Sequence, residues 1–247
     1  VVDVLEPVEV EEQHRHALVG RGGAGELAAE SLHPEQPVRE GGERVVGRLV
    51  AQPVAPKPLL PPSRGRAIEI RLMQRGDPAF AALPLTPAVL DYRFSQGAVC
   101  LGAFKGGAAI GCLWLCLGPY LEDEVRCRFV PQDASWDFDV YLLPEHRVGF
   151  GFARLWDEAN AYLRARGLRW SISRIDVLNT KSLAAHDKLG IRILATAVFV
   201  RLGPLQIMLA HVAPFIGLSL SNESAPTLRL HAPQAAPVVE NPVKAGT

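Results

Sequence analysis

The sequence predicts a mixed α/β protein whose twisted sheet is mostly antiparallel and is flanked by helices. Short apolar or alternating runs joined by tight turns predict antiparallel strands in the first half of the central region. A strand–helix–strand order in its second half predicts helices on the faces of a mixed sheet. All aromatic residues lie between Phe80 and Phe215, so this region is expected to supply the core.

The regions outside this centre predict little folded structure. Residues 1–66 have no aromatic residue, show no sustained helical or strand period, and end in a proline-rich stretch from Pro53 to Pro62. We therefore expect a disordered or non-native extension over 1–66, for example from a start site placed too early. The folded domain is expected over 67–212, and a disordered tail rich in Pro and Ala over 213–247.

The first elements of the domain follow from local patterns. Ala67 to Met73 alternates in hydropathy and predicts a strand. Residues 78–94 are expected to be helical in parts, with Thr86-Pro87 as a helix start. Residues 98–104 and 108–117 are apolar runs separated by Lys105-Gly106-Gly107, which predicts a hairpin.

The later elements alternate between strands and helices. Two more strands are expected at Val125–Val130 and Ser135–Leu143, paired through the turn between them. An amphipathic helix is predicted from Gly151 to Arg166 and ends at Gly167. The remaining expected elements are a strand at 170–177, a helix at 180–189, a strand at 192–202 and a further strand at 205–209.

Composition narrows the class of partner. The formal net charge is zero, so we expect no nucleic acid and no anionic membrane as a partner. The apolar run from Leu113 to Leu117 is too short to span a bilayer, and the N-terminus does not read as a signal peptide. The four cysteines lack metal-ligand spacing and are expected to be buried free thiols of a cytoplasmic protein, with no metal site.

The segment from Leu142 to Gly151 passes from a strand into a helix and contains Gly149-x-Gly151. A helix N-terminus carries unpaired N–H groups and the positive end of the helix dipole. Glycines there let the backbone approach a pyrophosphate closely. The alternative interpretation is a plain turn between a strand and a helix.

This segment resembles the acyl-CoA-binding motif of the GNAT superfamily, written Gln/Arg-x-x-Gly-x-Gly/Ala after a strand. Counting back from the glycines puts His146 in the first position, and counting forward from Pro144-Glu145 puts Arg147 there. The resemblance implies that Leu142, Leu143 and the backbone of Val148, Gly149, Phe150, Gly151 and Phe152 contact the cofactor.

A second motif resembles the same superfamily. Asn179 to Gly190 is similar to its Asn-x-x-Ala/Ser-x-x-x-Tyr-x-x-x-Gly-Phe segment. The resemblance implies that Asn179 contacts the pantetheine arm, that Ser182 takes the small position, and that His186 stands where the family commonly has a Tyr. His186 would then donate a proton or hydrogen bond to the leaving thiolate. The alternative is that it only packs between helix and sheet.

The GNAT resemblance also implies that two central strands splay apart around the thioester. A backbone N–H near Leu142 would then stabilise the developing oxyanion.

Charged residues on the strands offer an acceptor site. Asp137 and Asp139 share one face of a strand, and Arg126 and Arg128 share one face of the strand before it. If the two strands pair, these stripes form a cross-strand ladder of ion pairs, or Asp139 is the anchor or base for an amine. Arg174 either lines the same cleft or joins the ladder.

The resemblance and the residues together predict an N-acyltransferase that uses acetyl-CoA or another acyl-CoA. A small-molecule or peptide amine would attack directly in a ternary complex, because no residue has the setting of a covalent nucleophile. The alternative is a GNAT-fold module that binds acyl-CoA or a partner with little or no turnover. The chain is expected to be a monomer or a homodimer.

Overall fold

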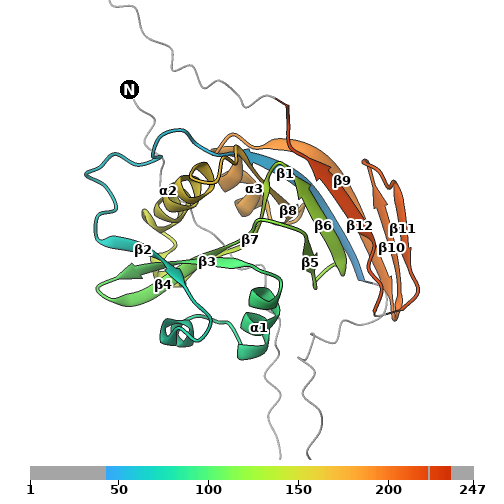
Figure 1. Ribbon diagram of the computed structural model, residues 1–247, viewed down its shortest axis with the longest axis horizontal. Helices are drawn as coiled ribbons and strands as arrows, with labels where there is room; N and C mark the ends of the chain where they lie inside the picture. The colour runs from blue at the N-terminus through green and yellow to red at the C-terminus, as the bar shows by residue number, and fades with distance from the viewer. Residues whose placement is uncertain (1–42, 222, 235–247) are drawn as a thin grey trace, which may run out of the picture.

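The computed structural model describes residues 43–221 and 223–234, which form a nine-stranded sheet, a three-stranded sheet and a few helices (Figure 1). In spatial order the large sheet contains β11 (Ile216–Ser219), β10 (Leu205–Ala210), β9 (Arg192–Leu202), β1 (Glu43–Pro53), β8 (Trp170–Asp176), β7 (Ser135–Leu142), β4 (Ala108–Cys116), β3 (Val99–Lys105) and β2 (Ile68–Met73). The small sheet contains β12 (Thr227–His231), β6 (Cys127–Gln132) and β5 (Tyr120–Glu122).

The helices are α1 (Pro87–Ser95), α2 (Gly151–Arg164) and α3 (Thr180–Asp187), with short 3-10 helices η1 (Pro78–Ala82) and η2 (Pro144–His146). Neighbouring strands of the large sheet are antiparallel except β7 and β8, which are parallel. The expected mixed, mostly antiparallel sheet flanked by helices is therefore confirmed.

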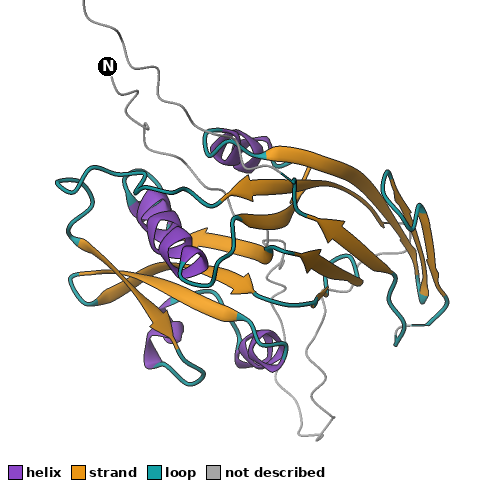
Figure 2. Ribbon diagram, turned by 45° about the horizontal axis from the view of Figure 1, so that its top comes forward, coloured by secondary structure: helices purple, strands orange, loops and turns teal. Residues whose placement is uncertain are grey.

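The large sheet has two differently covered faces (Figure 2). Helix α2 packs on β2, β3, β4 and β7, and its buried Leu155, Trp156 and Leu163 form one core cluster with Leu113 and Leu115 of β4. The other face carries a second core cluster under the small sheet, α1 and η1. Both faces of the central strands are therefore buried from solvent.

Local patterns explain the expected elements that the structure contains. The hairpin of β3 and β4 turns at Gly106 and Gly107, whose φ angles of 58° and 83° favour glycine. The Thr86 hydroxyl accepts a hydrogen bond from Val89 N at 3.3 Å and caps α1. Gly167, with φ of 74°, follows the end of α2.

Strand β6 corrects the expected pairing of the two strands around residues 131–134. β7 pairs with β4, whereas β6 lies in the small sheet between β5 and β12. The Asp and Arg stripes therefore do not form the expected ladder. Hairpin geometry from sequence assumes that neighbours along the chain pair, and here each strand finds a partner elsewhere.

Strand β1 corrects the expected boundary at residue 67. It pairs antiparallel with β8 along one edge and with β9 along the other, and it buries Leu49, Val50 and Ala51 completely. The part of the chain before residue 43 lies outside the described residues. The folded unit therefore includes β1 from Glu43 onward. A strand without aromatic residues is stable here because it pairs with a neighbour on each side.

Residues 54–66, which we call the strap, connect β1 to β2 along α2. Ala55 N donates to Asn160 Oδ1 at 3.2 Å, and Leu59 N donates to Asp157 Oδ1 at 2.5 Å. The Arg164 guanidinium donates to the Ala55 carbonyl. Polar side chains of α2 thus satisfy the backbone of a proline-rich segment that has no ladder of its own.

The described part of the C-terminal region also corrects the expected tail from residue 213. β11 extends the large sheet beyond β10, and β12 adds to the small sheet parallel to β6. Leu228 and Leu230 of β12 are buried in the core. Residues 222 and 235–247 lie outside the described residues.

Within the described ranges, no helix combines the length and the apolar character needed to cross a membrane. No group of three or more His, Cys, Asp or Glu side chains in that same part of the chain is arranged to hold a metal ion. All four cysteines are buried and free.

We predict that Leu49→Ala lowers the free energy of unfolding by about 2–5 kcal/mol, because it leaves a cavity in the core cluster under the small sheet. Leu178→Ala, at a side chain that is 86% exposed, is the matched control and is expected to change stability by less than about 0.5 kcal/mol. Urea unfolding followed by tryptophan fluorescence measures both. Equal small effects, or a stable soluble chain that starts at Ser63, would contradict the placement of β1.

Candidate functional site

The loop between β7 and α2 is built for close approach of its backbone. η2 carries the chain from the end of β7 to Gly149, whose φ of 140° is a conformation that side chains with a Cβ rarely adopt. A Cβ on Gly151 would lie 3.0 Å from Leu142 Cδ2, so glycine lets the start of α2 pack on the end of β7. The predicted glycine pair therefore has two distinct structural reasons.

The N-terminus of α2 has no side-chain cap. Its N-cap residue is Phe150, which cannot accept a hydrogen bond from the first-turn N–H groups. These groups and the helix dipole make the end of α2 electropositive. An anion placed there would satisfy donors that the chain itself leaves open.

A cavity of about 410 Å³ lies at this helix end. Its walls come from Gly149, Phe150 and Gly151, from the strap and the start of β2 (residues 63, 65–68), and from Lys105, Ile110, His146 and Val148. Three of these residues are basic: Arg66 from the strap, Lys105 from the β3–β4 turn and His146 from η2. Basic residues from three separate elements therefore line the cavity at the helix N-terminus.

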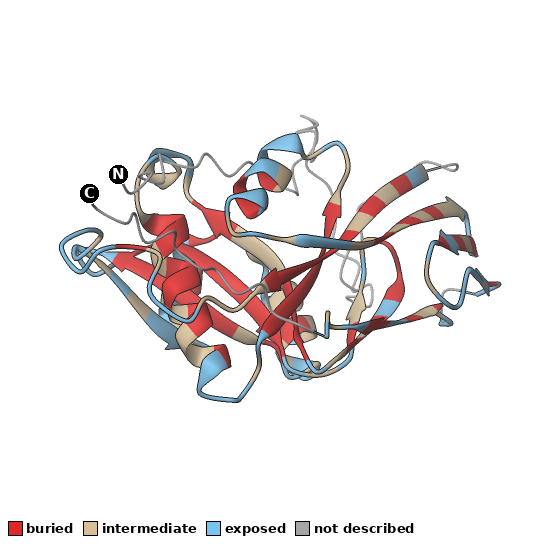
Figure 3. Cartoon of the chain, turned by 90° about the horizontal axis from the view of Figure 1, so that it is seen from above, coloured by how far each residue is buried: buried red, intermediate tan, exposed pale blue. Residues whose placement is uncertain are grey.

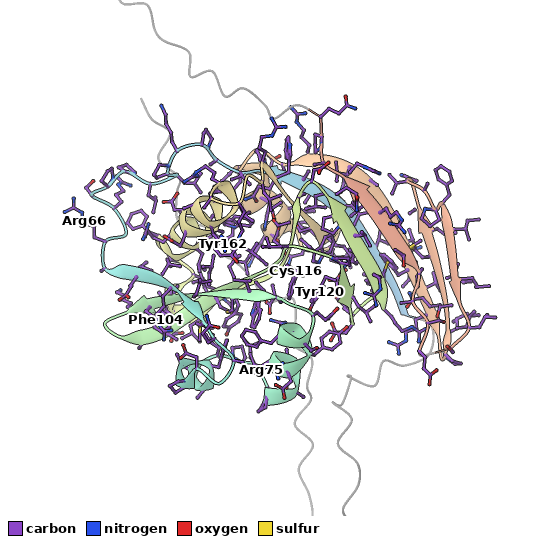
Figure 4. All side chains as sticks on the ribbon, in the orientation of Figure 1. Arg66, Arg75, Phe104, Cys116, Tyr120 and Tyr162 are labelled. Atoms are coloured by element: carbon purple, nitrogen blue, oxygen red, sulfur yellow. The ribbon has the colours of Figure 1, made fainter. Side chains whose placement is uncertain are left out.

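The strap is fixed against this cavity. Arg66 Nε donates to the Pro62 carbonyl at 2.6 Å, and the Arg64 guanidinium lies over the Phe150 ring at 5.6 Å. Figure 4 shows Arg66 on the outer loop that leads into β2. Sequence reasoning missed Arg66 and Lys105, although the cluster Arg64-Gly65-Arg66 before the first expected strand was a visible signal.

His146 and Arg147 take different positions. His146 lines the cavity, whereas Arg147 Nε turns back to the Leu142 carbonyl at 3.1 Å and its guanidinium lies 5.9 Å from the Tyr141 ring centroid. Of the two residues that the motif alignments left open, His146 lines the cavity and Arg147 does not. Arg147 instead supports the end of β7.

Strands β7 and β8 separate soon after they begin. Their recorded pairs are Ser135 with Ser171 and Trp136 with Ile172. Farther along, Leu143 donates its N–H to the Ile110 carbonyl of β4 at 2.9 Å. Since N–H groups alternate sides along a strand, the N–H of Leu142 points toward the β8 side, as an oxyanion donor in a splay would.

Asp137 lies at the point where β7 and β8 separate, on the face covered by α2 and α3. The Ser171 hydroxyl donates to Asp137 Oδ1 at 2.5 Å, and the Ser135 hydroxyl donates to Ser171 Oγ at 2.8 Å. Burial raises the pKa of Asp137 to about 7, because removal from water disfavours the carboxylate. The group is therefore poised to exchange a proton near neutral pH.

Asp139 occupies a β-bulge in β7. The register against β4 shifts between Leu113 and Trp114, and Asp139 has φ of 56°. Its carboxylate pairs with Arg93 of α1 at 2.5 Å, and the Arg93 guanidinium also lies over the Trp114 and Phe138 rings. The bulge turns Asp139 away from the face of Asp137, so the two carboxylates do not act together.

Of the three arginines expected near the acceptor, two are engaged elsewhere and one is exposed. Arg126 lies in the turn before β6 and donates to the Pro204 carbonyl at 2.7 Å, and Arg128 is exposed on β6. Arg174 is completely buried and holds Glu122 through two bonds of 2.9 and 2.8 Å, with Glu124 as a second partner. Burial lowers the pKa of Arg174, but the two carboxylates outweigh it and raise the pKa above its ordinary value. The ion pairs hold the β5–β6 turn against β8.

His186 is buried between α3 and α2. Its Nδ1 lies 2.8 Å from the Ser182 carbonyl, and its ring packs edge-on against Phe152 and Trp156. A carbonyl only accepts hydrogen bonds, so Nδ1 carries the proton and Nε2 is basic in the neutral ring. Desolvation lowers the pKa of His186, which favours this neutral form.

Asn179 and Ser182 begin α3. Asn179 Oδ1 accepts from Ser182 N at 2.9 Å and caps the helix. Ser182 is buried, with its hydroxyl 3.4 Å from His186 Nδ1. Asn179 therefore has a structural role, because its side-chain oxygen caps the helix that carries His186. Its contact with the cofactor stays a prediction.

Comparison with known proteins gives no matching family model and no matching curated protein. Among solved structures, a Drosophila protein is 17% identical with a TM-score of 0.45, over 66% of this chain and 52% of that one. A GCN5-related N-acetyltransferase from Sphaerobacter thermophilus is 18% identical with a TM-score of 0.44, over 65% and 52%. A tandem GNAT protein from the clavulanic acid biosynthesis pathway is 18% identical with a TM-score of 0.42, over 62% and 51%.

The chain spans about half the length of each of these three structures.

We predict that Asp137 makes a contribution to the free energy of unfolding that falls as the pH rises from about 4 to about 7. The folded chain keeps the Asp137 proton in this range while the unfolded chain loses it, so the loss is on the order of 2–4 kcal/mol. Asp137→Asn should remove this part of the pH dependence, measured by urea unfolding at several pH values. Asp133→Asn, in the exposed turn before β7, should retain it; an unchanged profile in Asp137→Asn would refute the assignment.

Proposed function

We propose that this chain is an acyl-CoA-dependent N-acyltransferase that uses acetyl-CoA and an amine acceptor. The observation that carries the proposal is the basic cavity at the uncapped N-terminus of α2. Its volume falls in the ordinary range for ligand pockets, about 300–1,000 Å³. The buried free cysteines favour a reducing compartment, the cytoplasm.

The donor would bind through its phosphates. The backbone N–H groups of residues 148–152 would receive the pyrophosphate, as helix N-termini do for other anions. Arg66, Lys105 and His146 would neutralise the remaining charge from the facing walls. Leu142, Leu143 and the Asn179–Ser182 end of α3 would line the path of the pantetheine arm toward the splay of β7 and β8.

Acyl transfer would then occur in a ternary complex. The acceptor nitrogen would attack the thioester carbonyl, a C–N bond would form, and the C–S bond would break to release CoA thiolate. The Leu142 N–H would stabilise the oxyanion. His186 would take the proton from the nitrogen at its basic Nε2 and return it to the thiolate, since its neutral form is the favoured one.

Asp139 would position the acceptor together with Arg93. The ion pair between them places a carboxylate and a guanidinium beside aromatic rings on the face opposite α2. An amine would interact with the carboxylate oxygens that Arg93 leaves accessible, because the Asp139 side chain is 20% exposed. The proposed acceptor site at Asp139 and Arg93 does not include Arg126, Arg128 or Arg174.

The second candidate function is an acyl-CoA-binding module without turnover. It is favoured by the Arg93–Asp139 pair, because a carboxylate oxygen that already accepts from Arg93 is not free to hold an amine. Both candidates need the donor cavity, and only the first needs His186 and Asp139.

We predict that acetyl-CoA binds and raises the melting temperature of the full chain. Gly149→Val should weaken binding at least about tenfold in calorimetry, because a β-branched residue cannot keep φ at 140°. Gly167→Val, also at positive φ but outside the cavity, is the control that reports the stability cost alone. No binding by the unaltered chain would refute both candidate functions.

We predict that CoA is released when acetyl-CoA and a panel of amines are supplied, detected by a thiol reagent. His186→Gln and Asp139→Asn should each lower kcat by about 10²-fold or more while the Kd of acetyl-CoA changes little. His211→Gln, at an exposed histidine, is the control. Donor binding without CoA release for any amine would leave the binding module as the function.

A further inference from the structure

Among the described residues, one half of the large sheet has an apolar face that no helix or second sheet covers. On β9, β10 and β11, the side chains that point to the same side as α2 form two rows across the strands. One row is Val198, Leu209 and Ile216, and the other is Val200, Ile207 and Leu218, which follows from the registers of the two pairings. We call these six residues the open face.

The opposite side of the same strands is fully covered. Met208 and Ala197 are completely buried beneath the small sheet, with Cys127 Sγ 3.9 Å from Met208 Sδ. On the open face, by contrast, Leu209, Ile216 and Leu218 are 45%, 68% and 59% exposed. Figure 3 shows this as stripes of buried and less buried residues along the strands, and Figure 1 places β10 and β11 at the end of the sheet away from α2.

Such a pattern is typical of strands that are buried on both sides. A sheet with one side in water carries polar residues on that side, but every member of the open face is apolar. Neither β10 nor β11 contains a charged residue or a proline, although β11 is an edge strand. Edge strands of monomers are usually protected by charges, proline or a cover.

The exposed apolar area supplies about half of what one side of a dimer interface needs. Leu202 and Leu220 flank the open face and are 48% and 72% exposed. With roughly 150 Å² for each large side chain, the exposed parts of these two and of Leu209, Ile216 and Leu218 amount to about 400 Å². A stable interface buries about 800 Å² per partner, so residues around the open face would supply the rest.

We propose that the open face binds the open face of a second copy of this chain about a twofold axis. An isologous contact uses the same patch on both partners and needs no complementary charge, which suits a patch that has none. The two rows of side chains would interdigitate as in the packing of two sheets face to face. The proposal is independent of the acyltransferase function, because the open face lies outside the donor cavity and the splay.

The test is the mass of the full chain in solution, measured by sedimentation velocity between about 1 and 100 µM. The unaltered chain should be a dimer, and Leu218→Glu should weaken the dimer at least about tenfold. Leu178→Glu places the same charge at a more exposed apolar residue that is not part of the open face, and should leave the dimer intact. Unchanged circular dichroism would show that each variant is folded.

Three results would overturn the proposal. The first is an unaltered chain that is monomeric over the whole range. The second is a dimer that survives the double change Ile216→Glu and Leu218→Glu. The third is evidence that something else covers the open face of a monomer. Residues 1–42 would be the cover if their deletion speeds up amide exchange in β10 and β11. A lipid surface would be the cover if the monomer floats with neutral phosphatidylcholine vesicles.

Discussion

Backbone pairing of β1 on both of its edges is the interaction on which the rest of the structure depends. This strand joins β8, which belongs to the region of the candidate site, to β9, which leads to the open face. Without it, the two halves of the sheet would present unpaired edges to each other. Gly47 of β1 also lets the buried Arg174 side chain lie across the strand, since a Cβ there would be 2.6 Å from Arg174 Cγ.

The same strand delivers the strap to α2, and the strap completes the donor cavity. Asp157 and Asn160 hold the strap backbone, while Arg66 adds charge at the far wall. The candidate site is thus assembled from the loop after β7, the β3–β4 turn and a segment that lies before the first strand of the expected domain. Stability and the proposed donor binding would share residues in this region, so changes in α2 are expected to affect both.

Much of the fold and the loop could be predicted because their signals are local. Gly149, Gly106 and Gly167 mark backbone conformations that need glycine, and Leu155 and Leu163 repeat at helical spacing. The small sheet, β1 and the Arg93–Asp139 pair could not be predicted in the same way. Their partners are distant in sequence, as in the pair from Arg93 to Asp139 with a separation of 46 residues. Absence of aromatic residues misled the interpretation of β1, because small apolar side chains suffice for a strand with two neighbours.

The placement of β1 also orders events during synthesis. β1 is made first among the strands of the sheet, yet its partners β8 and β9 follow it by more than one hundred residues. On the ribosome, β1 therefore has no partner strand until nearly the whole domain has been made, and its apolar side chains stay exposed until then. Closing so long a loop makes folding slow, so the nascent chain has a long interval in which this segment is open to chaperones or to wrong partners.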